Sequence, residues 1–512
     1  TATATGGTAT GSYAESCGIY FEEKATISGG EVTAEGATQA VRSFTGSVTI
    51  DPAEGQQITV TAGADEDSAV KITDSPFTEE KEISDSSISS AQYFHSIAEE
   101  AGDPGPDDSN LYVGGVGLTG DKDTTAYALT NESGAVTTTG ATADNYNIKW
   151  DGETLTLNNA DITQGSYKGA AIYCGEDAGI HLVLVGDSTV TGPSGDTSNG
   201  IYTRGELTIS GDGTLDVSGG GISLFVTGDL TISDGTVTAT GGEVSANDAY
   251  SYGIFTPHDI TISGGTVTAE GGTASTTGTG YAESFGISVR DLTVSGGSVN
   301  ATGGTASATG PNGKAYSGGI DAYYNITISG GTVNADGGTA SATGPNGEAY
   351  SRGFYAAGIT ISGGEVTATG GSASAAGTDG EVYSSGIDAL RITVAPAERE
   401  QITVTVGADE SSAAEITGSP FQEETEITGL ASAAGVAYFK SAAEPARYSV
   451  TLHPNGGTIA DGKDVTSYLC GTGASLPGAG DVTRSGYRFA GWYADEGLPG
   501  GPSTQVSAAA PS

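Results

Sequence analysis

The chain has 512 residues, a formal net charge of −45, 84 glycines and only 7% aromatic residues. Such an acidic chain argues against a nucleic-acid partner, because phosphate binding requires basic patches, and it favours cation binding or a cationic partner. No run of eighteen apolar residues occurs, so the sequence offers no candidate for a membrane-spanning helix. Three widely separated cysteines, Cys17, Cys174 and Cys470, predict free thiols rather than a disulfide framework or a metal knuckle.

Residues 1–96 have the pattern of the end of one repeat array. Residues 25–34 read Ala-Thr-Ile-Ser-Gly-Gly-Glu-Val-Thr-Ala, and a related Val-Thr-Ile piece begins 23 residues later. Residues 1–19 resemble the middle of a repeat, so we expect the sequence to be a piece of a longer protein whose targeting segments lie outside it. Residues 97–110, rich in Pro, Gly and Asp, are predicted to be a linker.

Residues 111–444 are predicted to form a second repeat array with a cap at each end. The run Ile-Thr-Ile-Ser-Gly-Gly-Thr-Val-Thr-Ala at 260–269 returns with small changes at 230–239, 292–301, 326–335 and 359–368. Each repeat divides into three short strands separated by glycine-rich turns, and alternation places the Ile, Val and Ala residues on one face. No single repeat can bury that face, so the repeats must stack. We predict an all-β fold, a right-handed parallel β-helix, over the alternative of an antiparallel sandwich with glycine turns.

The repeat spacing predicts where the coils widen. The anchor positions, taken as the second apolar residue of each Ile-Thr-Ile piece, are Leu157, Leu184, Ile209, Ile232, Ile262, Val294, Ile328, Ile361 and Val394. Their spacings are 27, 25, 23, 30, 32, 34, 33 and 33 residues. The shorter spacings suit a bare three-strand coil, whereas 30 or more residues leave room for an insert. We therefore expect inserts only after Ile232.

Two matching segments follow the last repeat of each array. Residues 52–96 and 396–441 share Pro-Ala-Glu, Gly-Ala-Asp-Glu, Ser-Pro-Phe and Tyr-Phe pieces in the same order. An uncovered last coil would expose unpaired strand edges, so the terminal segments of a solenoid are expected to be caps. We predict one cap fold for both segments, with Phe77 and Phe421 plugging the last coil.

Residues 446–507 have a different character. They carry Asn-Gly-Gly at 455–457, Leu-Pro at 476–477 and Gly-Tyr-Arg-Phe-Ala-Gly-Trp-Tyr at 486–493. This segment closely resembles the Listeria–Bacteroides repeat, the internalin B-repeat type. The resemblance implies a small β-grasp-like module found in tandem on bacterial surface proteins. Four aromatic residues, Tyr487, Phe489, Trp492 and Tyr493, are expected to supply its small core.

The solenoid itself resembles, less specifically, the carbohydrate-binding β-helix family of cellulosomal bacteria. Residues 151–157 (Asp-Gly-Glu-Thr-Leu-Thr-Leu) and 207–215 (Leu-Thr-Ile-Ser-Gly-Asp-Gly-Thr-Leu) carry the likeness. That family is similar in fold to pectate lyases, and the resemblance implies binding of acidic polysaccharides with calcium.

A tyrosine recurs at the end of each insert. The insert at 303–317 is repeated almost unchanged at 337–351, and a Pro-Asn-Gly turn in each predicts a hairpin. Inserts at one point of every coil stack into a ridge, which aligns Tyr250, Tyr281, Tyr316, Tyr350 and Tyr383. A file of aromatic faces can bind sugar rings or a partner's loop. The alternative, which we favour about two to one, is that the tyrosines stack on one another and only stabilise the ridge.

An acidic file precedes the second strand. Asp229, Asp259 and Asp291 occupy one repeat position, together with Glu206 and Asn325. Like charges on adjacent coils repel unless a cation intervenes, and carboxylates with turn carbonyls are calcium ligands. Calcium is therefore a candidate cofactor at Asp229, Asp259 and Asp291. The alternative is that these residues shape a solvated turn.

The sequence offers little for catalysis. Its four histidines, His95, His181, His258 and His453, fit no zinc or triad spacing, so we expect no enzymatic turnover. We expect a secreted or cell-surface bacterial adhesin or glycan-binding repeat protein, extracellular, with a glycan or a host surface protein as partner and with tandem or filamentous assembly open to it. A structural stalk without a ligand is the alternative, and a polysaccharide lyase comes third.

Overall fold

The computed structural model describes most of the chain after residue 110 and shorter stretches before it. The described residues are 2–5, 17–21, 25–28, 31–35, 39–43, 48–52, 56–65, 70–71, 77, 81–83, 91–100, 111–120, 124–175, 179–376, 380–428, 436–493 and 505–506. They fall into two compact units, residues 1–108 and 109–512. The described residues of each unit are all-β, apart from one short 3-10 helix, η1 (Glu410–Ser412).

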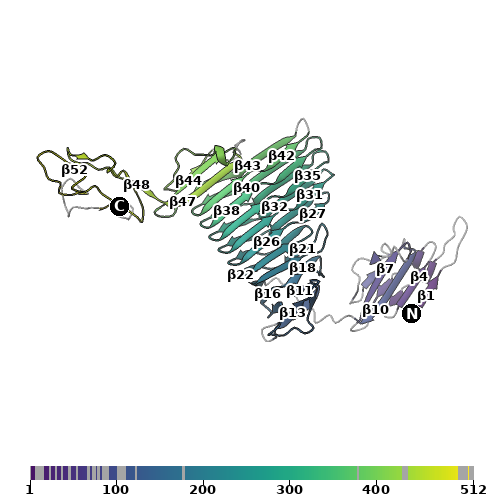
Figure 1. Ribbon diagram of the computed structural model, residues 1–512. Helices are drawn as coiled ribbons and strands as arrows, with labels where there is room; N and C mark the ends of the chain where they lie inside the picture. Colours follow the sequence, from purple (N-terminus) through teal and green to yellow (C-terminus); the bar gives the residue numbers. More distant parts are fainter. Residues whose placement is uncertain are drawn as a thin grey trace. The chain divides into compact units, whose positions relative to one another are not determined.

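The second unit contains a parallel β-helix with three strands in each coil (Figure 1). The first strands are β18 (Ala170–Cys174), β21 (Asn199–Thr203), β24 (Ile222–Val226), β28 (Ala249–Phe255), β32 (Tyr281–Val289) and β36 (Lys314–Ala322). The second strands are β16 (Thr154–Asn158), β19 (Ile180–Val185), β22 (Leu207–Gly211), β25 (Leu230–Ile232), β29 (Asp259–Ile262), β33 (Asp291–Val294) and β37 (Asn325–Ile328). In β40 (Glu348–Ile361) and β43 (Glu381–Val394) the first and second strands are continuous.

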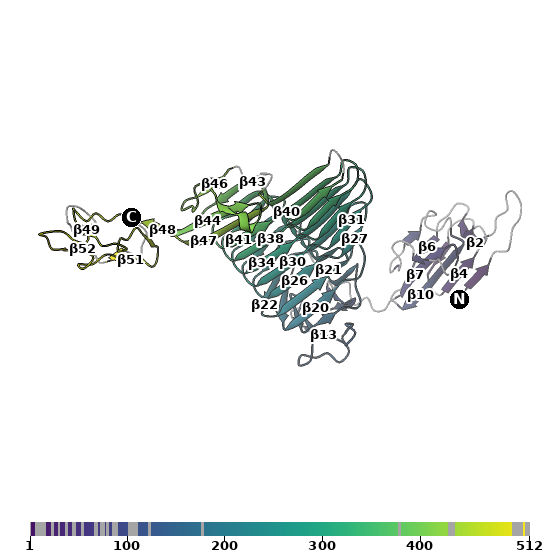
Figure 2. The same cartoon turned by 45° about the horizontal axis from the view of Figure 1, so that its top comes forward.

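The third strands form a separate sheet along the solenoid. They are β17 (Asp161–Ile162), β20 (Asp187–Thr191), β23 (Thr214–Ser218), β26 (Thr236–Thr240), β30 (Thr266–Glu270), β34 (Ser298–Thr302), β38 (Thr332–Asp336) and β41 (Glu365–Thr369), and most are visible side by side in Figure 2. Alternation within β29 and β30 buries Ile260, Ile262, Val267 and Ala269, and the same positions of each coil join one continuous core. The predicted three-strand coil is confirmed.

The register agrees with the predicted anchors except at one place. Ile232 pairs with Ile262, and the later anchors pair down to Val394 as predicted. The predicted step from Leu184 to Ile209 is wrong, because Leu182 pairs with Ile209 and Leu184 pairs with Gly211. Leu182 and Leu184 are both buried, since residues two apart in a strand face the same side, so the sequence pattern could not separate the two registers.

The predicted inserts begin after Ile232, as the spacing indicated. They add a fourth, parallel sheet of short strands, β27 (Glu243–Ser245), β31 (Thr273–Thr276), β35 (Thr305–Ala308), β39 (Thr339–Ala342) and β42 (Ser372–Ala375). The inserts have their own core, which consists almost entirely of alanines, among them Ala282, Ala315 and Ala349. Small side chains let the insert strand lie close to the first strand, so the insert stack is thin.

Two columns of small residues join the inserts to the coils. On each first strand that follows an insert, one serine Oγ donates to the carbonyl of a glycine that connects the insert to the coil. Ser284 donates to Gly272 at 2.7 Å, and Ser317 donates to Gly304 at 2.8 Å. Ser284 Oγ also accepts from the N–H of Gly304 in the next coil, at 3.1 Å. The second column is glycine: a Cβ on Gly353 would lie 2.6 Å from the Ala335 carbonyl oxygen, which leaves no room for a side chain.

The insert stack differs at its two ends. At its first strand, Val244 is buried. At its other end, Val382 on β43 is 51% exposed, although its in-register neighbour Ala349 is fully buried. Within the described residues, β42 pairs only with β39, so the alanine stack ends on an open strand edge.

Strands of reversed direction cover both ends of the main solenoid. At the first end, β11 (Leu111–Val113) pairs antiparallel with β18, and β15 (Ile148–Trp150) pairs antiparallel with β16. At the other end, β46 (Thr425–Ile427) pairs antiparallel with β43, and β47 (Tyr438–Pro445) lies between β41 and β44 (Glu400–Gly407). Phe421 and Phe439 are buried in the main core there.

The first unit repeats this cap on a shorter stack. Its parallel pairs are β1 (Ala2–Thr5) with β4 (Glu31–Glu35), β2 (Cys17–Phe21) with β5 (Gln39–Ser43), and β3 (Ala25–Ile27) with β6 (Val48–Ile50). In its cap, β10 (Tyr93–Glu100) lies antiparallel between β4 and β7 (Gln56–Gly63), and β9 (Lys81–Ile83) pairs with β6. Ile58 bridges Phe77 just as Ile402 bridges Phe421, so the described strands of the two segments pair in the same way.

The C-terminal segment forms three small two-stranded sheets. They pair β48 (Arg447–Ser449) with β50 (Ser467–Leu469), β49 (Thr458–Ile459) with β52 (Val482–Thr483), and β51 (Ala474–Ser475) with β53 (Gln505–Val506). Trp492 is buried, donates its indole N–H to the Pro477 carbonyl at 2.8 Å and contacts the Phe489 ring edge-on. The expectation that Tyr487 joins this core is wrong: it is 68% exposed, because its ring lies against the Arg484 guanidinium at the surface.

We predict that truncation after Val394 makes the protein aggregate, because it removes the strands that cover β41 and β43. Truncation after Pro445 keeps the cap and serves as the matched control. Sedimentation velocity should show large species for the first variant only. Equal sedimentation of the two truncated chains would show that the cap is not needed to protect the edge.

Candidate functional site

An aromatic ladder runs along the outward side of the first strands. On the early coils Tyr173, Tyr202, Phe225 and Phe255 share one register position. Successive ring centroids lie 5.4, 5.1 and 5.1 Å apart. The sequence analysis missed this column, although its signal is present: an aromatic residue follows directly after a buried Ile or Leu in each of these strands.

On the later coils the predicted tyrosine file forms a second column, five residues before the ladder position of the same strand, and the side that carries it is here called the tyrosine face. We define it as the outward side of β28, β32, β36, β40 and β43. Tyr316, Tyr350 and Tyr383 pair in register as predicted. Tyr250 shares their column, but Glu283 stands between it and Tyr316.

The predicted alignment of Tyr281 is wrong. Tyr281 pairs with Lys314, two positions before the tyrosine column. A shift of two residues keeps the side chain on the same face of the strand. The Tyr281 ring therefore still lies 6.2 Å from the Tyr316 ring. The sequence alignment placed Tyr281 in the column because the hairpin before Tyr281 differs in length by one or two residues from the hairpins of the later coils.

The tyrosines differ in how much surface they offer. Tyr316 and Tyr350 are partly buried and stacked, with centroids 5.1 Å apart and planes 9° apart. The Tyr350 hydroxyl donates to Glu381 at 2.7 Å, and burial, aided by that bond, raises its pKa well above the ordinary range. Tyr250 and Tyr281 are about 40% exposed, at 40% and 42%. The stacking that was expected of a purely structural file thus occurs, while exposed rings remain at its first end.

Arg352 fixes the ring positions in the last coils. Its guanidinium carbon lies 4.6 Å from the Tyr350 centroid and 4.7 Å from that of Tyr355, within cation–π range. Its Nε lies 2.8 Å from a carboxylate oxygen of Asp388, and both side chains are largely buried. Tyr355 is 42% exposed, so one face of this clamp is open to a ligand.

Two carboxyl groups interrupt the aromatic columns: Glu283 stands between Tyr250 and Tyr316, and Asp321 stands between Phe255 and Tyr355. The Tyr252 hydroxyl donates to Glu283 at 2.6 Å, and burial raises the pKa of the Glu283 carboxyl. Asp321 follows Ser288 in register. Burial raises the pKa of the Asp321 carboxyl to about 7, the Glu283 carboxylate adds to this shift, and the Arg352 guanidinium opposes it.

The acidic file lies at the turn before the second strands. Asp259 pairs with Asp291, and the Asp229 carboxylate accepts from the Asp259 backbone N–H at 3.1 Å. Arg290 is 2.8 Å from Asp259 and 3.6 Å from Asp291, and His258 lies 3.9 Å from Asp229. Basic neighbours and backbone donors therefore engage all three carboxylates.

This geometry does not fit a calcium site formed by the three aspartates together. Within the part of the chain that the structure describes, no three His, Cys, Asp or Glu side chains gather closely enough to hold a metal ion. Calcium at Asp229, Asp259 and Asp291 stays an untested prediction.

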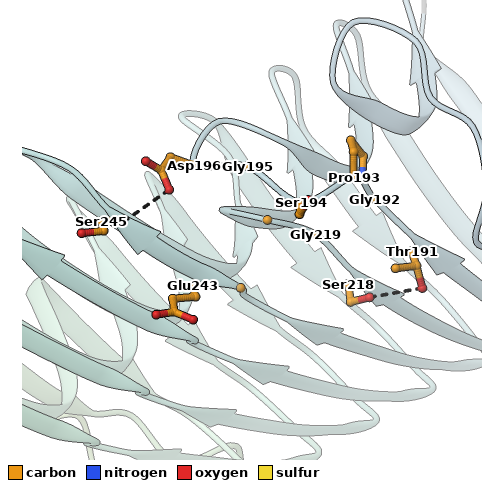
Figure 3. Close-up of a pocket in the computed structure, with 12 residues that line it drawn as sticks. Thr191, Gly192, Pro193, Ser194, Gly195, Asp196, Ser218, Gly219, Glu243 and Ser245 are labelled. Atoms are coloured by element: carbon orange, nitrogen blue, oxygen red, sulfur yellow. Dashed lines mark hydrogen bonds between the residues drawn. The ribbon is translucent and has the colours of Figure 1, made fainter.

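A cavity of about 490 Å³ lies where the insert stack begins (Figure 3). It is lined by residues 191–196, 218–220, 242–243 and 245, most of them Gly and Ser. Asp196 accepts from the Ser245 backbone N–H at 3.3 Å, so this loop lies against β27, the first insert strand. The cavity therefore results from the way the loop of residues 191–196 covers the edge of β27.

We predict that Asp321→Asn stabilises the protein at pH 8 and has no effect near pH 4. Because the pKa of the Asp321 carboxyl is raised in the folded state, the folded protein loses stability as the pH rises from the unfolded-state pKa of about 3.8 towards the folded-state pKa of about 7. The expected gain at pH 8 is about 2 kcal/mol in the free energy of unfolding.

Denaturant unfolding at both pH values measures this effect, with Asp216→Asn, an exposed carboxylate on β23, as the control. If the free energy of unfolding changed equally between pH 4 and pH 8 in the wild type and in Asp321→Asn, the raised pKa of Asp321 would be contradicted.

Comparison with known families finds two matches. Residues 448–508 match the Listeria-Bacteroides repeat domain, and residues 26–41, 230–254, 260–282, 326–347 and 359–380 match the Beta helix repeat. Comparison with curated proteins and with solved structures gives no significant match. Among the described residues, no helix has the length and hydrophobicity that crossing a bilayer requires. The chain is thus a β-helix repeat protein with a C-terminal Listeria-Bacteroides repeat, a combination typical of surface or secreted proteins.

Proposed function

We propose that this is an extracellular bacterial adhesin that binds a glycan chain along its tyrosine face without turning it over. The observation that carries the proposal is the pair of aromatic columns, whose rings follow one another from coil to coil between β18 and β28 and again between β36 and β43. A repeating surface suits a repeating ligand, because successive sugar units can meet equivalent groups.

The exposed rings are the ones we assign to binding. Tyr281 and Tyr355 are each 42% exposed, so their faces can stack on sugar rings. A pair further along, Tyr323 and Tyr324, is 71% and 48% exposed and lies in the turn before β37. Sequence reasoning missed Tyr323 and Tyr324 because they recur in no other coil, and it missed Tyr355 because Ser288 and Asp321 separate it from the aromatic column of the early coils.

A structural stalk is the second candidate, and the ring-to-ring contacts favour it. Tyr316 and Tyr350 stack on each other, and the Tyr350 hydroxyl is bonded to Glu381. Groups engaged in this way stabilise the solenoid whether or not a ligand binds. The two candidates differ in what the exposed rings do, so the test must address those rings.

We predict that Tyr281→Ala with Tyr355→Ala weakens glycan binding about tenfold or more, with little change in melting temperature, because ring stacking contributes about 0.5–1.5 kcal/mol per contact and these rings are exposed. Tyr487→Ala, an exposed tyrosine in the C-terminal repeat, is the control. Tyr316→Ala with Tyr350→Ala should by contrast lower the melting temperature.

A glycan array of these variants, read with calcium and with chelator, is the measurement. Absence of any glycan bound by the wild type under both conditions would favour the stalk. Binding lost on chelation would support calcium at the acidic file. Release of unsaturated sugars from polygalacturonate would instead make the protein a lyase.

A further inference from the structure

The charges on the tyrosine face limit which glycans it can accept. Over the first-strand stretches 248–255, 281–289, 314–322, 348–356 and 381–389 this face carries six acidic side chains and two basic ones, a formal net charge of −4. The exposed Arg391 lies on the second-strand part of β43, outside these stretches. The carboxylates are Asp248, Glu283, Asp321, Glu348, Glu381 and Asp388, and the cations are Lys314 and Arg352.

Both cations are already paired. Lys314 Nζ lies 2.7 Å from Glu348, and Arg352 Nε lies 2.8 Å from Asp388. Burial of the Arg352 pair fixes it in place, because breaking a buried pair leaves an uncompensated charge. Neither side chain is therefore available to bind a carboxylate or sulfate on a ligand.

Among the described residues, neither Glu283 nor Glu381 forms an ion pair, and both act as hydrogen-bond acceptors. Glu283 accepts from Tyr252, and Glu381 accepts from Tyr350. An ionised carboxylate accepts several hydrogen bonds, so each of these groups has further capacity. Sugar hydroxyls can supply such donors, and a sugar ammonium supplies them together with a positive charge.

We infer that the ligand of the tyrosine face is an amino-sugar polymer carrying positive charge, with Glu283 and Glu381 selecting its ammonium groups. This inference rests on the proposed glycan binding and names the ligand class. Neutral sugars bind by ring stacking and hydroxyl hydrogen bonds without an ionic contribution, and polyuronates are rejected by repulsion. A cationic amino-sugar polymer is a different ligand class from the acidic polysaccharide that the resemblance to carbohydrate-binding β-helices implies.

The test compares three probes of equal length: hexamers of β-1,4-linked glucosamine, of N-acetylglucosamine and of galacturonate. Calorimetry with the full chain at pH 6, in chelator, is run at low and at high salt. We expect the glucosamine hexamer to bind about tenfold more tightly than the acetylated one at low salt, an advantage that high salt removes. The galacturonate hexamer should not bind.

Glu283→Gln with Glu381→Gln should bring the two binding hexamers to equal affinity. Glu423→Gln with Glu424→Gln makes the same change in net charge on exposed cap residues and should leave the preference intact. Galacturonate binding as tight as that of the acetylated hexamer, or equal effects of the two double variants, would overturn the charge assignment alone. If no hexamer binds, the proposed glycan binding fails and the inference fails with it.

Discussion

In-register parallel pairing of each coil with the next is the constraint on which the structure depends. Because strands in a sheet lie about 4.8 Å apart, every side chain meets its counterpart from the neighbouring coil at that spacing. A residue type that is unfavourable beside its own copy must be avoided or compensated. Apolar residues satisfy this condition in the core, alanines satisfy it in the inserts, and serines satisfy it by bonding glycine backbone on two successive coils.

The same constraint produces the surface features. Aromatic residues tolerate their own copies well, so they form a ladder whose rings contact one another. Carboxylates do not, and basic residues accordingly stand among them: Arg290 beside Asp259, Lys314 beside Glu348, Arg352 beside Asp388. At Glu283 and Asp321 burial raises the carboxyl pKa values above the ordinary range, and the Glu283 carboxylate adds to the shift of the Asp321 pKa.

Much of the fold follows from periodicity, because alternation and repeat length determine which residues face the core and where a coil has extra length. Periodicity cannot resolve a shift of two residues, which leaves the same face buried, and both register errors have this form: Leu184 in place of Leu182, and Tyr281 in the column that Glu283 occupies. The candidate site was harder to predict from the sequence than the fold. Arg352 occurs in one coil, so a search for recurrence passes over it, and Tyr355 is separated from the aromatic column of the early coils by Ser288 and Asp321.

The central claim is that the outward face of the first strands holds a sugar chain. A crystal structure of the full chain grown with a β-1,4-linked hexasaccharide of N-acetylglucosamine tests it most directly. The account predicts sugar rings stacked on Tyr281 and Tyr355, with hydroxyls donating to Glu283 or Glu381. Sugar seated on the acidic turn of Asp259 and Asp291, with the tyrosine face bare, would contradict it.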